Sequence, residues 1–558
     1  MLRGPSAFPV SLTSHPTPPS PRRDVRSPAR RRSEPWLAAL VGAAVLAIGP
    51  AGAARAEVAP PLVPAPAAAS VVASVPKLIE VEASTLPNGL RLWIQRTPGS
   101  GEAHVRFVVQ AGSGVEPDNA NGAAHFVEHI LFDRETDPAI HGLIQKLEAN
   151  GAYYNAFTTV DMTYAVIDSF AADLEPALEL VARSLALASF TPEQIEPERQ
   201  IVARELAEKQ DDQLLLGVRG QLYGDQAVAR PEGGTPESID QITARQLRNF
   251  YQAHYRPPGL VLVVLADRPA DEIRGAIEKT VGQLTWSGRA PPAYPPPERS
   301  PGPIQTEDLD HTGALMHGMV AAGARDPDYY ALWVLQELLE IRLYDRIRVH
   351  GGMSYAPYVY FTPNRHEGML YLYASADESD FGTMADAFDA ELTRVSSGEI
   401  APEEVLEARN RVANRFLREH LSGEDLANHL AWMAGVLEPN ELPVDPVEPL
   451  KRVSRKDLKR VADRWGTDEL RIDARSTTAP SAEPEPTLVT RLVAWALPGG
   501  FALLVLLQLA TLRRVRGLKR AIEAPTASPT SGSSTAAAAT ATTAPEKPGS
   551  ASSSSLAA

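Results

Sequence analysis

Apolar positions in the first half of the chain repeat with two periods. Asn88-Gly89 is the residue pair that a tight hairpin turn requires, and the residues after it alternate as a strand. Other short alternating or apolar runs predict strands at about residues 105–110, 163–168 and 261–265. Runs with apolar residues three and four positions apart predict helices at about residues 123–132, 140–149, 174–187 and 192–211. This mixture predicts a sheet with helices on one face.

The second half has a similar rhythm. It predicts strands at about residues 314–322, 355–361 and 369–376, a helix at 329–348, and two or more helices after them. We interpret this half as a diverged internal repeat of the first. The predicted fold class is α+β, with two homologous domains, each a mostly antiparallel sheet with helices packed on one face, followed by one C-terminal transmembrane helix.

Proline and small residues separate these parts. Residues 287–303 hold Pro291, Pro292, Pro295, Pro296, Pro297, Pro301 and Pro303, which predicts a stiff linker. The predicted domains are therefore 77–286 and 304–477. Residues 57–76 are rich in Ala, Pro and Val and predict a disordered linker.

The first 56 residues have the order of a secretory signal peptide. Three arginines at 30–32 precede an uncharged apolar run at 36–48, and Ala54-Arg55-Ala56 supplies the small residues of a cleavage site. We predict cleavage after Ala56. An organellar transit peptide is the alternative, because residues 1–35 are rich in Arg, Ser and Pro, but transit peptides lack the apolar run.

A second apolar run predicts one membrane span. Residues 492–512 contain no charge and are long enough to cross a bilayer as a helix. The basic residues Arg513, Arg514 and Arg516 follow it, so the positive-inside rule places the tail, residues 513–558, in the cytoplasm. The tail is basic at first, and from residue 521 its Ala, Ser, Thr and Pro composition predicts disorder.

Charge and composition narrow the chemistry. The chain has 69 acidic and 54 basic residues and a net charge of −15, which argues against a nucleic-acid partner. It has no cysteine, so disulfides and thiolate metal sites are excluded. A zinc site here must use histidines and carboxylates.

Residues 125–129, His-Phe-Val-Glu-His, offer such a site. His125 and His129 are four residues apart and share one face of a helix, with Glu128 beside them. The order His-x-x-Glu-His is the inverted form of the common zinc-protease motif. On their own, the two histidines could equally be surface or core residues.

A third ligand can come from the helix predicted at 192–211. Glu198 and Glu205 are seven residues apart and share a face of that helix. Either one could complete a His/His/Glu set and leave the fourth zinc position open to water. The competing interpretation is a solvated acidic face, since other acidic residues crowd the same helix.

These motifs together resemble the pitrilysin and insulin-degrading enzyme family of inverted-motif zinc peptidases, and most closely its two-domain members of the mitochondrial processing peptidase kind. Residues 121–132 resemble the family's active-site helix, 147–158 its Gly-x-x-Asn-Ala strand, and 250–257 its Tyr-x-Pro segment. The resemblance covers about residues 85–477. The family's third ligand follows the second histidine by about seventy-six residues, and 205 − 129 = 76, which selects Glu205.

The resemblance implies a role for each site residue. It implies one Zn²⁺ per chain, with Glu128 as base and then acid. Glu198 could orient one of the ligands, or it could be an ordinary residue of the helix surface. In the second half Arg348 and Tyr355 resemble the family's Arg/Tyr pair, which implies contact with the substrate backbone and the oxyanion. Substrate binding falls to Asn155 and Ala156 on an edge strand, where an extended peptide adds as a further strand.

The implied function is a zinc metalloendopeptidase that hydrolyses peptides or unfolded protein segments in a chamber formed by paired two-domain halves. The partner would be a second copy or an inactive homologous subunit. The signal and the span together predict a single-pass protein of a bacterial inner membrane with its catalytic domains in the periplasm. One alternative is a non-catalytic, peptidase-like structural subunit of a membrane-anchored complex, and another is a zinc hydrolase with a non-peptide substrate.

Overall fold

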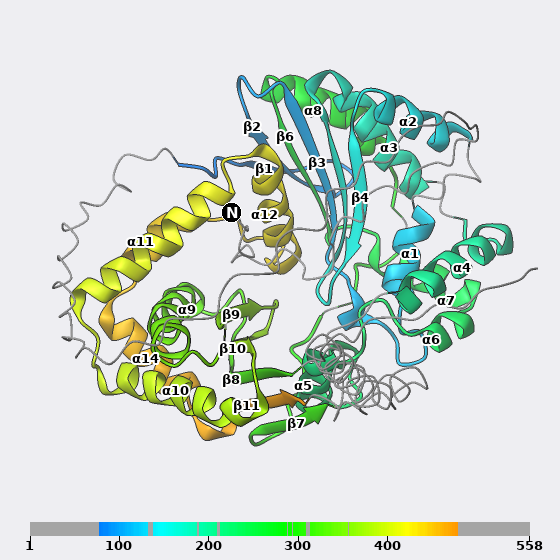
Figure 1. Cartoon of the computed structure of the whole chain (residues 1–558). Coiled ribbons are helices and arrows are strands. Elements are labelled where there is room, and N and C mark those ends of the chain that lie inside the picture. The colour runs from blue at the N-terminus through cyan, green and yellow to red at the C-terminus, as the bar shows by residue number, and fades with distance from the viewer. Residues whose placement is uncertain are drawn as a thin grey trace, which may run out of the picture. The chain divides into compact units, whose positions relative to one another are not determined.

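The computed structural model describes residues 77–131, 138–186, 189–208, 213–286, 288–292, 294–308, 313–354 and 356–477 (Figure 1). The predicted signal peptide, the linker at 57–76, the transmembrane helix and the tail lie outside the described residues. Within the ranges just given, no helix is both long enough and apolar enough to cross a bilayer.

The first half forms a six-stranded sheet with the order β1-β2-β6-β3-β5-β4. Its strands are β1 (Glu82–Thr85), β2 (Arg91–Arg96), β3 (Glu102–Val109), β4 (Tyr153–Thr158), β5 (Thr163–Phe170) and β6 (Leu260–Ala266). The pairing is antiparallel except between β2 and β6. Strand β6 is buried along its whole length, as its unbroken Leu and Val content requires of a central strand. Strand β4 is at the sheet edge.

The hairpin predicted at Asn88-Gly89 is confirmed and joins β1 to β2. The Gly89 amide donates to the Leu86 carbonyl over 2.8 Å, and Gly89 has φ +88°, a conformation that glycine adopts without steric cost. The Asn88 side chain accepts the Leu90 amide at 3.2 Å. The pair therefore fixes the register of the first two strands.

Helices cover one face of this sheet. The four predicted helices are present as α1 (Ala123–Leu131), α2 (Pro138–Ala149), α3 (Leu174–Ala186) and α4 (Pro192–Glu208). Three more follow: α6 (Pro236–Gln241), α7 (Ala244–His254) and α8 (Ala270–Lys279). The buried residues of α1, α2, α3, α7 and α8 form one apolar core with the inward face of β2, β3 and β6. Helix α4 packs against α1 and adds Ile195 and Val202 to the same core.

The second half forms a five-stranded sheet with the order β7-β11-β8-β10-β9. Its strands are β7 (Ile304–Asp308), β8 (Ala314–Ala322), β9 (Tyr358–Pro363), β10 (Glu367–Ser375) and β11 (Arg471–Ser476). The helices of its main layer are α9 (Tyr329–Leu343), α10 (Glu378–Ser397), α11 (Pro402–Glu419), α13 (Val447–Arg452) and α14 (Arg455–Trp465). The helix predicted at 329–348 ends as α9 at Leu343 and continues as a π-helical turn, Tyr344–His350.

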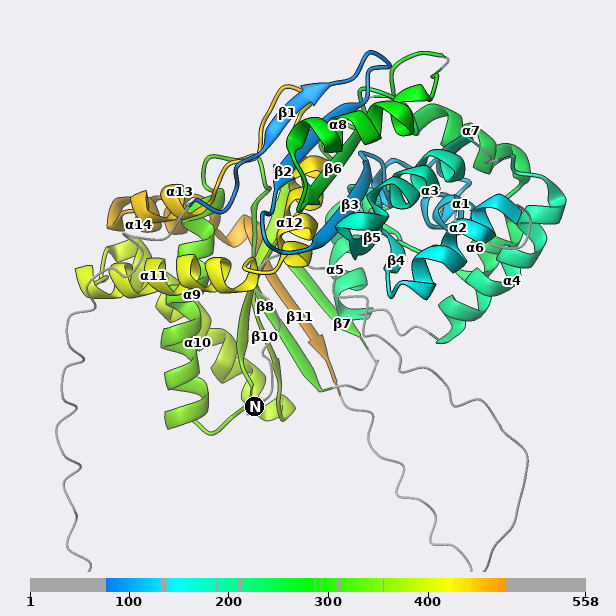
Figure 2. The same cartoon turned by 90° about the horizontal axis from the view of Figure 1, so that it is seen from above.

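Two helices cross between the halves. Helix α12 (Gly423–Val436), from the second half, packs on the other face of the first sheet against β3 and β6 (Figure 2). There Arg106 Nε donates to Asn428 Oδ1 over 2.8 Å. Helix α5 (Gln213–Tyr223), from the first half, packs on β7 and β11 of the second sheet (Figure 1). The α+β class with two sheets is therefore confirmed. The prediction that helices pack on one face of each sheet is wrong, because a helix from the opposite half covers the other face.

Candidate metal centre

Helix α1 brings three polar side chains to one place. His125 and His129 lie one turn apart, and their Nε2 atoms are 3.2 Å from each other. His125 and Glu128 are buried, with exposed fractions of 9% and 8%. Buried polar groups need hydrogen-bond or metal partners, so neighbouring elements must supply partners for these side chains of α1.

Helix α4 supplies the third group. Glu205 Oε1 lies 3.7 Å from His125 Nε2, and Glu205 Oε2 lies 3.3 Å from His129 Nε2. A tetrahedral site with zinc–ligand bonds of about 2.1 Å separates its ligand atoms by about 3.4 Å, so these spacings fit one small cation. Within the described part of the chain, this is the one group of three or more His, Asp or Glu residues with donor atoms that converge for a metal.

Glu198 occupies a different position from Glu205. Its Oε2 atom lies 3.4 Å from His129 Nδ1, the ring nitrogen on the far side from the convergent Nε2 atoms. A carboxylate there fixes the tautomer and the orientation of a metal-binding histidine. The geometry thus distinguishes the two glutamates: Glu205 converges with the histidines and Glu198 does not. Their spacing on the helix alone could not distinguish them.

The carboxylates favour positive charge at this point. Burial lowers the pKa of His129, but hydrogen bonds to Glu198 and Glu205 and the charges of Glu128 and Glu205 outweigh it and raise the pKa to about 10. A divalent cation supplies the same positive charge when His129 gives up its proton. The donor set of two imidazoles and one carboxylate is the set that zinc uses when a fourth position stays open.

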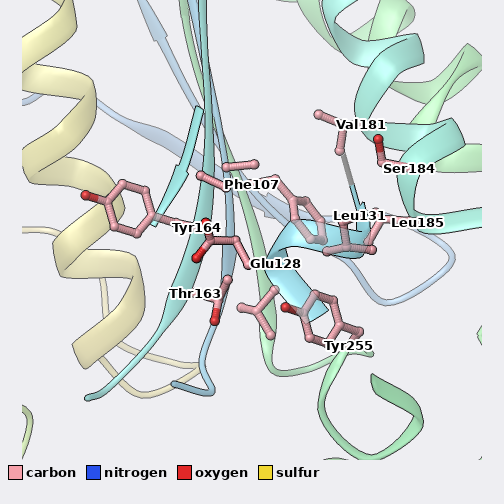
Figure 3. A pocket seen from close by; sticks show the side chains of 12 residues that line it. Phe107, Glu128, Leu131, Thr163, Tyr164, Val181, Ser184, Leu185 and Tyr255 are labelled. Carbon is pink, nitrogen blue, oxygen red and sulfur yellow. The ribbon is translucent and has the colours of Figure 1, made fainter. Parts of the chain in front are cut away.

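Glu128 points to the edge strand of the first sheet. The Thr158 hydroxyl on β4 donates to Glu128 Oε2 over 2.7 Å. Figure 3 shows Glu128 beside Thr163 and Tyr164 in a pocket that is otherwise lined mostly by apolar side chains, among them Phe107, Leu131, Val181 and Leu185. The carboxylate is therefore held in place and largely screened from water.

Asn155 and Ala156 lie on β4, and the prediction that they occupy an edge strand is confirmed. Helix α1 packs against this strand. The Ala156 amide donates to the Asn155 side-chain oxygen over 2.8 Å, and Asn155 Nδ2 donates to the Tyr153 hydroxyl over 2.7 Å. Among the described strands, the edge strand β4 thus lies against the helix that carries His125, Glu128 and His129.

Arg348 lies in the π-helical turn of the second half, and its guanidinium stacks over the Tyr344 ring at 5.2 Å. Tyr355 lies outside the described residues. The roles implied for this pair stay predictions.

The structure adds a residue that sequence reasoning missed, Glu116. Its buried carboxylate accepts the amides of Gly122 and Ala124 at 2.9 and 2.8 Å and the Asn121 side chain at 3.1 Å. Burial raises the pKa of Glu116 to about 7 against these hydrogen bonds. Glu116 thus caps the start of α1 from outside the helix. No local pattern in the sequence marked it, because Gly122 before Ala123 is itself an ordinary N-cap residue.

A glycine pair that sequence reasoning also missed lies against His125. A Cβ atom on Gly233 would stand 2.7 Å from Leu206 Cδ2 and 3.4 Å from His125 Nδ1. Gly234 has φ +82°, and a Cβ there would stand 2.9 Å from the Asn121 carbonyl oxygen. Only glycines allow this loop to come so close to α1, and the Gly-Gly sequence was the available signal.

Comparisons with known proteins agree with this geometry. Residues 91–232 match the family described as insulinase (peptidase family M16), and residues 241–412 match a family described as the peptidase M16 inactive domain. An uncharacterized zinc protease of Mycobacterium leprae is 32% identical over 350 residues, which cover 60% of this chain and 77% of that protein.

Two further similarities extend over more of the chain. A probable mitochondrial-processing peptidase subunit beta of Arabidopsis thaliana is 25% identical over 427 residues, which cover 70% of this chain and 77% of that protein. The crystal structure of a protease from Helicobacter pylori has a TM-score of 0.65 at 21% identity and covers 71% of this chain and 98% of that one. The similarity to the Helicobacter pylori structure is a similarity of fold alone.

Proposed function

The chain belongs to the insulinase family of zinc proteases, peptidase family M16, and from this premise we propose that it is a zinc metalloendopeptidase acting on peptides or unfolded protein segments. One observation carries the proposal: His125, His129 and Glu205 converge within 4.8 Å, with Glu128 on the same helix. Relatives that have lost the activity would be free to lose these groups, and this chain has all four.

Each residue has a task in peptide hydrolysis. His125, His129 and Glu205 would hold the zinc, and Glu198 would keep the His129 ring in its tautomer. When bound, the metal polarises the scissile carbonyl and lowers the pKa of its water toward neutrality. Glu128 would take a proton from the attacking water and pass it to the leaving amine, while the Thr158 hydroxyl holds the carboxylate in place.

The free edge of β4 supports an extended substrate. A peptide that pairs there as a further strand runs alongside α1 and brings its carbonyls to the metal ligands. Most backbone groups of a folded protein are already paired, so this mode favours peptides and unfolded segments. On this proposal Arg348 and Tyr355 contact the substrate backbone from the second half, in the same subunit or in its partner.

Partner and location are part of the proposal. The chain is one two-domain half, and a second copy or an inactive homologous subunit would close the chamber. The apolar run at 492–512 would anchor it in a bacterial inner membrane with both sheets in the periplasm. Full-length protein should then require detergent for extraction, and extraction of the full chain in buffer alone would refute the anchor.

The test compares the full chain with its Glu128→Gln variant on quenched unstructured peptides, with bound zinc measured in the same samples. We expect cleavage by the native chain, and zinc retention with a loss of kcat of at least about a hundredfold in the variant. Glu340→Gln is the matched control, because Glu340 is a largely enclosed carboxyl on α9 of the second half, and it should leave cleavage unchanged. If all three proteins bind zinc and none cleaves the peptides, the chain is a non-catalytic subunit and the proposed peptidase activity is refuted.

A further inference from the structure

Helix α5 is anchored on the second sheet although the chain reaches it directly from the zinc-binding helix α4. Its apolar residues Leu214, Val218 and Leu222 share a core with Ile304, Met316 and Ile472. Gln221 Nε2 also donates to the Gln305 carbonyl of β7 over 2.7 Å. The position of α5 is therefore set by the half of the molecule that lacks the metal ligands.

Arg219 projects from α5 to a loop of the first half. The side chain is 7% exposed. Its Nε and Nη2 atoms donate to the Val228 carbonyl over 2.8 and 2.5 Å, and Nη2 also donates to the Arg230 carbonyl at 3.3 Å. Nη1 donates to Glu232 Oε1 at 3.2 Å. One buried guanidinium thus holds three points of a five-residue stretch.

That loop continues directly to the metal ligands. The Pro231 carbonyl accepts Asn121 Nδ2 at 3.0 Å, just before α1 begins. Gly233 touches both ligand-bearing helices, because a Cβ there would meet His125 of α1 and Leu206 of α4, the neighbour of Glu205. The loop that Arg219 holds thus lies against one of the convergent residues, His125, and against Leu206, the residue next to Glu205.

We propose that Arg219 is a positioning residue for the metal centre, through which the docking of α5 on the second sheet sets the spacing of His125 and Glu205. The inference rests on the metal site of the proposed function and adds the way in which the second half supports it. A loop fixed at Val228, Arg230 and Glu232 cannot move away from α1 and α4, so the two helices keep the separation that one cation requires. Loss of the guanidinium would free the loop and loosen the site.

Arginine suits this task better than lysine. The acceptors are two backbone carbonyls and one carboxylate in different directions, and a planar guanidinium reaches them with its fixed fork of donors. A lysine ammonium is a point charge that would satisfy some of them. Arg219→Lys should therefore keep part of the effect and Arg219→Met none.

The test measures the metal and not the reaction. Zinc affinity is determined by chelator competition on the full chain, and the visible spectrum of the cobalt-substituted protein reports ligand geometry. We expect Arg219→Met to weaken zinc binding about 10- to 100-fold and to shift the cobalt bands, as loss of outer support for metal ligands does. Arg219→Lys should fall between this variant and the native chain.

Arg106→Met is the matched control. Arg106 is fully buried and also joins the halves, because its Nε atom donates to Asn428 of α12. Its ion pair with Asp168 at 2.7 Å lies within the first sheet, between β3 and β5. It should lower the thermal midpoint and leave zinc affinity and the cobalt spectrum unchanged. A folded Arg219→Met protein with native zinc affinity and a native spectrum would overturn the proposal.

A second variant covers the case in which Arg219→Met does not fold. Gly233→Ala acts at the other end of the same connection and should shift the cobalt bands in the folded protein, and an unchanged spectrum would overturn the proposal. A native chain that binds zinc without cleaving peptides would refute the peptidase and leave these metal measurements decisive. A native chain that binds no zinc would refute both.

Discussion

Helices α1 and α9 occupy corresponding positions, because each is the first long helix after a central strand, β3 in one sheet and β8 in the other. The polar side chains of the two helices have different kinds of partner. In α1, His125 and His129 face a carboxylate of another helix and converge with it. In α9, Gln336 Nε2 donates to the Val359 carbonyl at 2.8 Å and to Glu340 at 2.7 Å, while Glu337 forms ion pairs with Arg411 and Arg415.

The difference lies in what each polar group is paired with. In α9 the carboxylate of Glu337 has arginines and the Gln336 amide has a carbonyl, so charge and donors are balanced within the chain. In α1 the histidines meet Glu198 and Glu205, which leaves negative charge that a cation neutralises. The same arrangement of strand and helix therefore brings two histidines and a carboxylate together in one half and holds ion pairs in the other, and the side chains decide which.

The largest expected difference between the two helices is in zinc affinity after one polar side chain is removed from each. We expect His129→Ala to weaken zinc binding on the order of a thousandfold or more, because one of three protein ligands is lost. Gln336→Ala on α9 should instead leave zinc binding unchanged and lower the free energy of unfolding by about 1–3 kcal/mol, since the buried Val359 carbonyl loses its donor. Chelator competition and urea unfolding measure the two effects. Equal zinc affinity in both variants would mean that α1 does not hold the metal.

A second prediction concerns one buried carboxyl in each half. Burial raises the pKa of Glu116 and that of Glu340 to about 7, above the ordinary value of 4.5. Between these pH values the folded chain keeps a proton that the unfolded chain has lost, so each group's stabilising contribution is complete below pH 4.5 and disappears as pH rises through 7. The loss is at most about 3 kcal/mol for each group.

Urea unfolding of the zinc-free chain at pH 5 and pH 8 tests this second prediction. Glu116→Gln and Glu340→Gln should each reduce the loss of stability between the two pH values. Only Glu116→Gln should also weaken zinc binding, because only Glu116 caps the metal-binding helix. A stability difference that is the same in both variants and the native chain would contradict the prediction.

A smaller effect should separate the two glutamates of α4. Glu198→Gln is expected to weaken zinc binding about 10- to 100-fold, since it removes the partner of His129 Nδ1 and leaves the ligands in place. Glu205→Gln should cost more, because a carboxylate ligand is replaced. The reverse order in chelator competition would exchange the roles of the two residues.

The smallest effect is expected at the free edges of the sheets. Tyr153 on β4 is 50% exposed and lies beside the proposed path of the substrate. Tyr153→Ser should raise KM for unstructured peptides about two- to tenfold and leave kcat nearly unchanged, because an aromatic contact to the substrate is lost. The counterpart Tyr360→Ser, on the edge strand β9, should leave KM unchanged if β4 alone binds the scissile segment. Equal shifts in KM would show that both edges bind substrate.

Local patterns in the sequence predicted most of the elements. Strand β8 is found at residues 314–322 as predicted, because a long apolar run between polar breaks allows one interpretation. The three convergent side chains could also be predicted, since His125 and His129 are spaced for one helix face and the resemblance selected Glu205. The helix predicted at 329–348 extends too far, since α9 ends at Leu343. The π-helical turn that follows has the same apolar pattern as an α-helix, so the sequence does not mark this end.

Features that depend on long-range contacts were out of reach. Glu116 looks like any loop acid until α1 folds above it. The sequence pattern could not predict that α5 and α12 each pack on the sheet of the opposite half, because an apolar helix face looks the same whichever sheet it covers. The predicted boundaries at 77–286 and 304–477 separate the two sets of strands, whereas the cores include one helix from each opposite half.

The position of α12 has a consequence for the order of events during synthesis. The first sheet is complete once β6 has left the ribosome at Ala266, but the helix that covers its second face ends at Val436, which is 436 − 266 = 170 residues later. At ordinary rates of translation this interval lasts on the order of 10 to 30 s. Val108, Val261 and Val263 remain uncovered for that time, so the nascent first half should bind chaperones, and a chain terminated at the proline-rich segment should aggregate.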